Sequence, residues 1–299
     1  MRQQGLFARP SEASIQPIGY ARCMRIEFTK MHGLGNDFLI LDLPADATLP
    51  SPAQWRALSD RHTGIGFDQA LVVQPARRAG TDAFLRIFNA DGGEVEQCGN
   101  GARCVAALLH QRGRNGAELL AIDGSAGTLR ARVLEADRVA VDLGVPNFNP
   151  AALPFDAPAR SASYLLSAGE ENIEIGAVSI GNPHAVLRVL AVESAPVQRI
   201  GAALQSHPLF PRQVNVGFMQ VLDAAHIALR VYERGVGETQ ACGTGACAAV
   251  VVGRDLGLLA ADVEVRVPGG VLSVHWDGPG QSVWLTGPAQ HAFEGRVEL

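Results

Sequence analysis

The sequence lacks several features that common enzyme classes need. Among its 299 residues it has a single lysine, Lys30, and it has no G-x-x-x-x-G-K-[ST] phosphate-binding loop. A pyridoxal phosphate enzyme needs a lysine for its Schiff base, and nothing around Lys30 supports that role. We therefore expect neither pyridoxal phosphate nor a nucleotide bound by a phosphate loop.

Cysteine is scarce, and its spacing is irregular. The five cysteines are Cys23, Cys98, Cys104, Cys242 and Cys247. An odd number of cysteines does not indicate a disulfide framework. No C-x-x-C occurs, and no two histidines lie three to five residues apart, so zinc-site spacings are missing. We expect no bound metal, and we expect the cysteines to be packed side chains or reactive thiols.

Long apolar runs and an excess of positive charge are also missing. The longest apolar run lies near residues 246–252 and is far shorter than the ~18 residues that span a bilayer. The net charge is −5, and no basic stripe is present. We therefore expect no membrane span and no nucleic-acid partner. A hydrophobic content of 47% allows a sizeable core, and a chain of this length predicts about two domains.

The first 23 residues differ in composition from the rest. They contain three arginines and only one acidic residue, Glu12, and they have no apolar stretch of the kind found in signal peptides. We expect residues 1–23 to be a disordered extension, with the patterned sequence beginning near Met24.

The chain contains an internal repeat. Residues 88–102 read FNADGGEVEQCGNGA and residues 232–246 read YERGVGETQACGTGA, and both fit aromatic-x(4)-G-E-x(3)-C-G-x-G-A without a gap. Upstream, Asn36 and Gln69 have the same separation as Asn182 and Asn215. We therefore predict two copies of one fold, with a boundary at the turn signal of residues 144–147.

Each copy predicts strands around one helix. Apolar residues after the first C-G-x-G-A have helical spacing, and residues 245–252 are apolar all round, which indicates a buried helix. Alternating apolar residues predict strands at 129–133, 139–143, 263–267 and 283–285. The predicted fold class is α+β, with two pseudo-symmetric domains.

Cys98 and Cys242 stand where a glycine turn leads into each predicted helix. A helix N-terminus presents free N–H groups to an anion and can lower a thiol pKa into a range of about 3.5–7.5. Two such thiols facing one α-carbon could remove its proton from one side and donate a proton from the other, without a cofactor. Cys104 and Cys247, inside the helices, are expected to be core residues.

Polar residues near the motifs break the symmetry of the repeat. Glu233 stands where the first copy has Asn89, Arg234 aligns with an alanine, and His184 aligns with Phe38. Arg234 suits a carboxylate and Glu233 suits an ammonium group, although a surface ion pair is the alternative for both. The paired amides favour site roles for Asn36, Gln69, Asn182 and Asn215.

These residues resemble the motifs of the diaminopimelate epimerase family. The likeness rests on KMHGLGNDF at residues 30–38, GIGFDQ at 64–69, GNPH at 181–184 and the two cysteine motifs at 89–104 and 232–247. It extends over nearly all of the chain from Met24 onward. The resemblance implies interconversion of LL- and meso-2,6-diaminoheptanedioate, in lysine and peptidoglycan synthesis, with Cys98 and Cys242 as the acid and base.

The resemblance also implies roles for the remaining site residues. Backbone groups at Gly99, Asn100, Gly243 and Thr244 would hold the reacting carboxylate. The rest of the site would be lined by Asn36, Gln69, Asn89, Asn182, Asn215, Glu233 and Arg234. Of these, Asn89, Asn182, Asn215 and Arg234 would read the distal amino-acid end, while His184 and Glu233 would tune the thiols.

For the architecture, the resemblance implies two domains, residues 24–145 and 146–288. Each would be a barrel-like sheet wrapped around a central helix, with the active site in the interdomain cleft, and the domains would close on substrate. The C-terminal segment 289–299 would return to the first domain. Family members are typically cytoplasmic homodimers, so we expect the same here.

Three other hypotheses remain open. Another cofactor-free racemase, such as a proline racemase relative, would share the thiol pair but would have no distal carboxylate to bind. A thiol redox or metal-binding protein would need other cysteine spacings. A non-catalytic binding module would keep its function when Cys98 is replaced.

Overall fold

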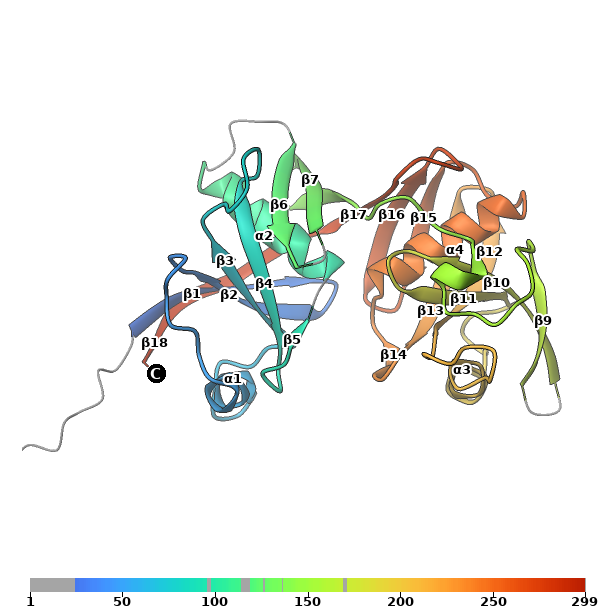
Figure 1. The fold of residues 1–299 in the computed structure, drawn as a ribbon, viewed down its shortest axis with the longest axis horizontal. Helices are drawn as coiled ribbons and strands as arrows, with labels where there is room; N and C mark the ends of the chain where they lie inside the picture. The colour runs from blue at the N-terminus through green and yellow to red at the C-terminus, as the bar shows by residue number, and fades with distance from the viewer. Residues whose placement is uncertain are drawn as a thin grey trace, which may run out of the picture.

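The computed structural model describes residues 25–95, 98–113, 119–125, 127–135, 137–168 and 171–298. The expected extension, residues 1–23, lies outside this part of the chain. The described residues form two lobes, and each has one long central helix with strands around it (Figure 1). The predicted α+β class with two similar domains is therefore confirmed.

The first ten elements in chain order build the first lobe. They are β1 (Arg25–Gly33), β2 (Asn36–Asp42), α1 (Pro52–Ser59), β3 (Gln69–Gln74), β4 (Ala83–Asn89), β5 (Glu94–Val95), α2 (Gly99–Gln111), β6 (Leu120–Gly124), β7 (Gly127–Glu135) and β8 (Arg138–Asp142). The start of α1 is fixed locally, because Ser51 and Gln54 form a capping box and Pro52 follows the cap.

The remaining elements follow a short 3₁₀ turn at Pro150–Ala152. They are β9 (Tyr164–Ala168), β10 (Glu171–Ser179), β11 (Pro183–Arg188), α3 (Val197–Gln205), β12 (Asn215–Asp223), β13 (His226–Glu233), β14 (Gly237–Thr239), α4 (Gly243–Asp255), β15 (Asp262–Val267), β16 (Gly270–Trp276), β17 (Val283–Pro288) and β18 (Gln290–Glu298).

Strand pairing reproduces the sequence repeat. The parallel pair β2–β3 sets Phe38 opposite Gln69, and the parallel pair β11–β12 sets His184 opposite Asn215. Parallel neighbours need a crossover connection, and α1 and α3 lie in these two crossovers. The alignment of His184 with Phe38 and of Asn215 with Gln69 is therefore confirmed by the register.

Strand pairing also connects the two lobes. The last strand of each repeat pairs with the other, since β8 runs antiparallel to β17 with Val141 opposite Leu285. The final strand, β18, returns to the first lobe and pairs along β1, as Figure 1 shows in red beside blue. In the second lobe β9 occupies the corresponding place beside β10. The lobes are consequently joined by paired backbone as well as by the covalent connection.

One apolar core runs through both lobes. It holds α2 and α4 together with inward residues of both sheets, and two smaller cores lie under α1 and α3. Every residue of α4 from Gly245 to Gly253 is buried, which confirms the predicted all-apolar helix. The predicted strands at 263–267 and 129–133 both alternate as expected, although in β7 the inward residues Leu129 and Val133 are only half-buried and Ala131 alone is fully buried.

Candidate functional site

The start of α2 presents Cys98. This residue is the N-cap in extended conformation, and its Sγ accepts a hydrogen bond from the Gly101 N–H at 3.3 Å. The glycines of C-G-N-G make room for this turn, because a Cβ on Gly101 would lie 3.0 Å from Leu71. The motif therefore places a free thiol at the positive end of a buried helix.

Cys242 has the same position on α4. It is the N-cap in extended conformation and is only 5% exposed. Its Sγ lies 3.7 Å from the Thr244 hydroxyl. The thiol is free, and so are those of Cys98, Cys104 and Cys247. Cys104 and Cys247 are fully buried in the shared core, which confirms their expected packing role.

The two helix starts meet. A Cβ placed on Gly243, at the start of α4, would lie 3.6 Å from the Asn100 Oδ1 at the start of α2. The carboxylate of Glu233 acts electrostatically on Cys98 and on Cys242 alike. The two thiols thus belong to one neighbourhood, although each comes from a different lobe.

Burial governs the acidity of both thiols. Desolvation raises the pKa of Cys98 to about 11, against the lowering effects of the Gly101 N–H and the Arg103 charge. Desolvation and the negative charge of Glu233 raise the pKa of Cys242 well above its ordinary value, against the Thr244 hydroxyl and the Gly245 N–H. The prediction that the helix N-termini lower the pKa of both thiols is therefore wrong for the chain without substrate. The loss of hydration on burial outweighs the effect of the helix N-terminus.

The amides of the first lobe form a connected set. Asn36 accepts a hydrogen bond from the Asn100 side chain at 3.2 Å and donates one to Asp68 at 2.9 Å. Gln69 donates to the Asn89 side chain at 2.9 Å across the β3–β4 pair. The structure therefore brings Asn36 to the start of α2 and sets Gln69 beside Asn89.

In the second lobe a chain of polar contacts leads from Cys242 to His184. Asn182 donates to the Thr244 hydroxyl at 3.3 Å, and its Oδ1 lies 3.0 Å from the His184 Nε2. Because an amide oxygen only accepts, this contact assigns the hydrogen to Nε2. Burial, with the nearby Arg234 charge, lowers the pKa of His184 to about 3, so the ring is neutral at physiological pH.

The Asn215 side chain binds the backbone at Arg234. Asn215 is buried, donates to the Pro183 carbonyl at 3.1 Å and accepts from the Arg234 N–H at 2.9 Å. The Arg234 guanidinium contacts the Arg212 carbonyl at 3.2 Å, and Glu233 accepts from the Thr239 hydroxyl. The amide nitrogen and the amide oxygen of Asn215 are thus both bonded to backbone groups, at Pro183 and Arg234.

An ionic network next to Asn36 was not predicted from the sequence. Arg61 contacts Asp37 at 2.8 Å and Asp68 at 2.7 Å, and buried Lys30 contacts Asp37 at 2.7 Å. Although burial alone would raise it, the pKa of Asp37 is held below its ordinary value by Arg61 and Lys30. The signal was present, since an aspartate directly follows Asn36 and another directly precedes Gln69.

The described residues contain no cluster of three or more histidine, cysteine, aspartate or glutamate side chains that could hold a metal ion. In the same part of the chain, no helix is both long and apolar enough to cross a bilayer.

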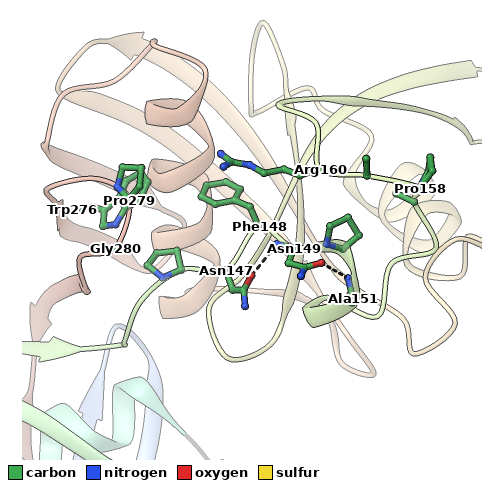
Figure 2. Close-up of a pocket in the computed structure, with 13 residues that line it drawn as sticks. Asn147, Phe148, Asn149, Ala151, Pro158, Arg160, Trp276, Pro279 and Gly280 are labelled. Atoms are coloured by element: carbon green, nitrogen blue, oxygen red, sulfur yellow. Dashed lines mark hydrogen bonds between the residues drawn. The ribbon is translucent and has the colours of Figure 1, made fainter.

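A cavity of about 620 Å³ lies away from the thiols, beside the segment that joins the lobes. Figure 2 shows Arg160 extending over the Phe148 ring, with Trp276 and Pro279 opposite. The guanidinium carbon of Arg160 lies 4.6 Å from that ring centroid. None of the predicted site residues lines this cavity.

Comparisons with known proteins agree with the geometry. The family model described as "Diaminopimelate epimerase" matches residues 28–149 and 176–292. The chain is 52% identical over 279 residues to a diaminopimelate epimerase of Nitrosomonas eutropha, covering 92% of this chain and 100% of the relative. It is also 52% identical over 278 residues to one of Alkalilimnicola ehrlichii, with the same coverage.

Two solved structures with the same fold have much lower sequence identity to this chain. A hydroxyproline epimerase of Agrobacterium vitis superposes with a TM-score of 0.65 at 17% identity, covering 92% of this chain and 93% of that one. A methylitaconate-delta-isomerase gives 0.65 at 16%, covering 93% and 96%. At such identities the likeness concerns the fold alone, whereas the two-part family match and the half-identical relatives show that the chain belongs to the diaminopimelate epimerase family.

Proposed function

We propose that this isomerase carries out the epimerisation of its family, between LL- and meso-2,6-diaminoheptanedioate, with Cys98 and Cys242 as a two-base pair and without a cofactor. The observation that carries the proposal is the meeting of two equivalent helix starts, each capped by a free thiol. A second support is that Lys30, the only lysine, is buried in contact with Asp37 and the Gly66 carbonyl.

The helix starts provide the carboxylate site. Backbone N–H groups in the first turn of a helix have no partner within the helix, and the helix field favours an anion there. Gly99 and Asn100 begin α2, Gly243 and Thr244 begin α4, and Asn100 lies near Gly243, so one carboxylate can lie between both ends. The same N–H groups stabilise the charge that moves into the carboxylate when the α-proton leaves.

In each turnover one thiol gains a proton from the substrate and the other gives a different proton to it. One thiolate takes the α-hydrogen, the C–H electron pair moves into the carboxylate, and the opposite S–H donates its proton to the other face of the carbon. The configuration inverts, and the thiolate ends on the second sulfur, so the reverse reaction uses the same groups. Raised thiol pKa values suit this step, because the thiolate of a weaker acid is a stronger base.

The remaining polar residues distinguish the two ends of the substrate. Arg234 offers a guanidinium to the distal carboxylate, and Glu233 offers a carboxylate to an ammonium group. Asn36, Gln69, Asn89, Asn182 and Asn215 line the site between these groups and the thiols. His184, neutral and linked to Thr244 through Asn182, acts with Glu233 on the thiol of Cys242.

We also propose a cytoplasmic homodimer that binds neither nucleic acid nor membrane. The domains are assigned to residues 24–145 and 146–288, and segment 289–299 belongs to the first domain. The resemblance to the family supports the dimer, and the pairing of β18 with β1 supports the domain assignment.

The function is tested with the purified chain, LL-diaminopimelate and ²H₂O under reducing conditions, with no added cofactor. We expect α-hydrogen exchange and formation of the meso isomer. Cys98→Ala and Cys242→Ala should each abolish epimerisation, whereas the control Cys104→Ala removes a core thiol and should retain it. No exchange on diaminopimelate, or exchange on L-proline instead, would contradict the proposal.

A further inference from the structure

Arg103, in the second turn of α2, is a buried cation to which the described part of the chain offers no carboxylate partner. Its side chain is fully buried, and among the described residues it forms no ion pair. Nη2 donates to the Asn100 Oδ1 at 2.8 Å and Nε to the Pro288 carbonyl at 3.4 Å, while Nη1 has no hydrogen-bond partner in this part of the chain. Arginine keeps its charge in proteins, and an unpaired buried charge is costly.

The fold makes room for this guanidinium at the junction of the lobes. A Cβ on Gly33, at the end of β1, would lie 3.2 Å from the Arg103 Nη2. A Cβ on Gly287, in β17, would lie 3.0 Å from its Cζ. Neither glycine has a positive φ, so their small size, rather than backbone freedom, is what the position uses. Elements from both repeats therefore enclose the charge.

Arg103 also breaks the symmetry of the two thiol sites. It stands five residues after Cys98, and the residue five after Cys242 is Cys247. The repeat thus gives the two thiols matching helix starts but gives a buried cation only to the first.

The charged and titratable groups around the site favour ionisation of Cys98 over that of Cys242. On Cys98 the Arg103 cation acts from α2, and Glu233 acts with opposite sign from the second lobe. On Cys242 Glu233 acts both through its charge and through a hydrogen bond. Around Arg103 itself the titratable groups are Cys98 and Cys104 on α2 and Cys247 on α4. When Cys98 ionises, its thiolate would therefore supply a counter-charge for Arg103.

We propose that Arg103 is a positioning residue of the active site, which fixes Asn100 at the carboxylate site and makes Cys98, rather than Cys242, the more readily ionised thiol before substrate binds. The proposal rests on the two-thiol function above. It assigns the pair unequal roles at rest although the two motifs are nearly identical.

The test measures each thiol without substrate, so its outcome is separate from that of the epimerisation assay. The full chain is treated with iodoacetamide at pH 8, and the alkylation rates of Cys98 and Cys242 are read by mass spectrometry. Below its pKa a thiol reacts in proportion to its thiolate fraction. Arg103→Met removes the charge, Arg103→Lys keeps it, and the control Arg112→Met removes a cation from the other end of α2.

We expect Arg103→Met to slow alkylation of Cys98 by about tenfold or more, the effect of one unit of pKa from a nearby charge. Cys242 should change far less. Arg103→Lys should restore most of the Cys98 rate, and Arg112→Met should leave it unaltered. If Cys98 reacts at the original rate in folded Arg103→Met, or both thiols slow equally, the proposal is overturned.

If Arg103→Met does not fold, the core thiols Cys104 and Cys247 will be alkylated as well. Two further measurements test the proposal in that case. Arg103→Gln is neutral but retains a donor for Asn100, and it should slow Cys98 as Arg103→Met does. The unmodified chain should be alkylated at Cys98 before Cys242. Faster reaction at Cys242 would overturn the proposal without any variant.

Discussion

At the scale of single residues, opposing effects of burial and helix position determine the state of the thiols. The glycine-rich motif predicts that Cys98 and Cys242 begin helices, and both are N-caps. The sequence does not predict the direction of their pKa shifts, because desolvation depends on how the lobes pack around them. The same holds for His184, whose burial makes it neutral.

These shifts give a pH dependence. Burial raises the pKa of Cys98 to about 11, so the thiolate fraction of free enzyme grows with pH throughout the neutral range. We expect kcat/KM, which reports the free enzyme, to rise from pH 6 to 8.5 without a histidine inflection, since the pKa of His184 is lowered to about 3. A plateau that begins near pH 6.5 would contradict this. As a control for denaturation, enzyme that is returned to pH 8 after each incubation should recover full activity.

At the scale of elements, the two central helices and four of the strands around them were predicted, whereas the pairing of the strands was not. Residues 245–252 are apolar all round and form the buried α4, and the spacing of Ala102, Val105 and Leu109 belongs to α2. The pairing of β8 with β17 joins residues far apart in the chain, and local patterns carry no information on such a partner. Nor did periodicity indicate that Arg103, amid apolar neighbours, would be fully buried.

Close packing of α4 against its sheet gives a prediction about stability. A Cβ on Gly176, in β10, would lie 2.3 Å from the Val252 Cγ1, whereas a Cβ on Gly217, in β12, would meet Leu229 at 3.5 Å. We expect Gly176→Ala to lower the free energy of unfolding by about 1–3 kcal/mol, as overpacking does. Gly217→Ala should change it by less than about 1 kcal/mol. Equal urea midpoints for the two variants would contradict this prediction, because they would show that β10 and α4 move apart without loss of stability.

At the scale of the whole molecule, duplication produces one site from two lobes. The repeat predicts two copies of one fold, and the equivalent registers of β2–β3 and β11–β12 agree with it. The sequence does not predict that one core includes both helices or that Asn100 reaches Gly243. Those contacts depend on how the copies dock, and they set both helix starts at one place.

Two thiols that act on opposite faces of one carbon leave a distinct isotopic signature. The most direct test follows LL-diaminopimelate in ²H₂O through the first few per cent of conversion and measures deuterium in product and in recovered substrate. Two bases predict that the meso product carries one solvent deuterium at the inverted carbon while the remaining LL substrate is still protiated. Deuterium appearing equally fast in both isomers, or product that retains the original hydrogen, would contradict a two-thiol mechanism.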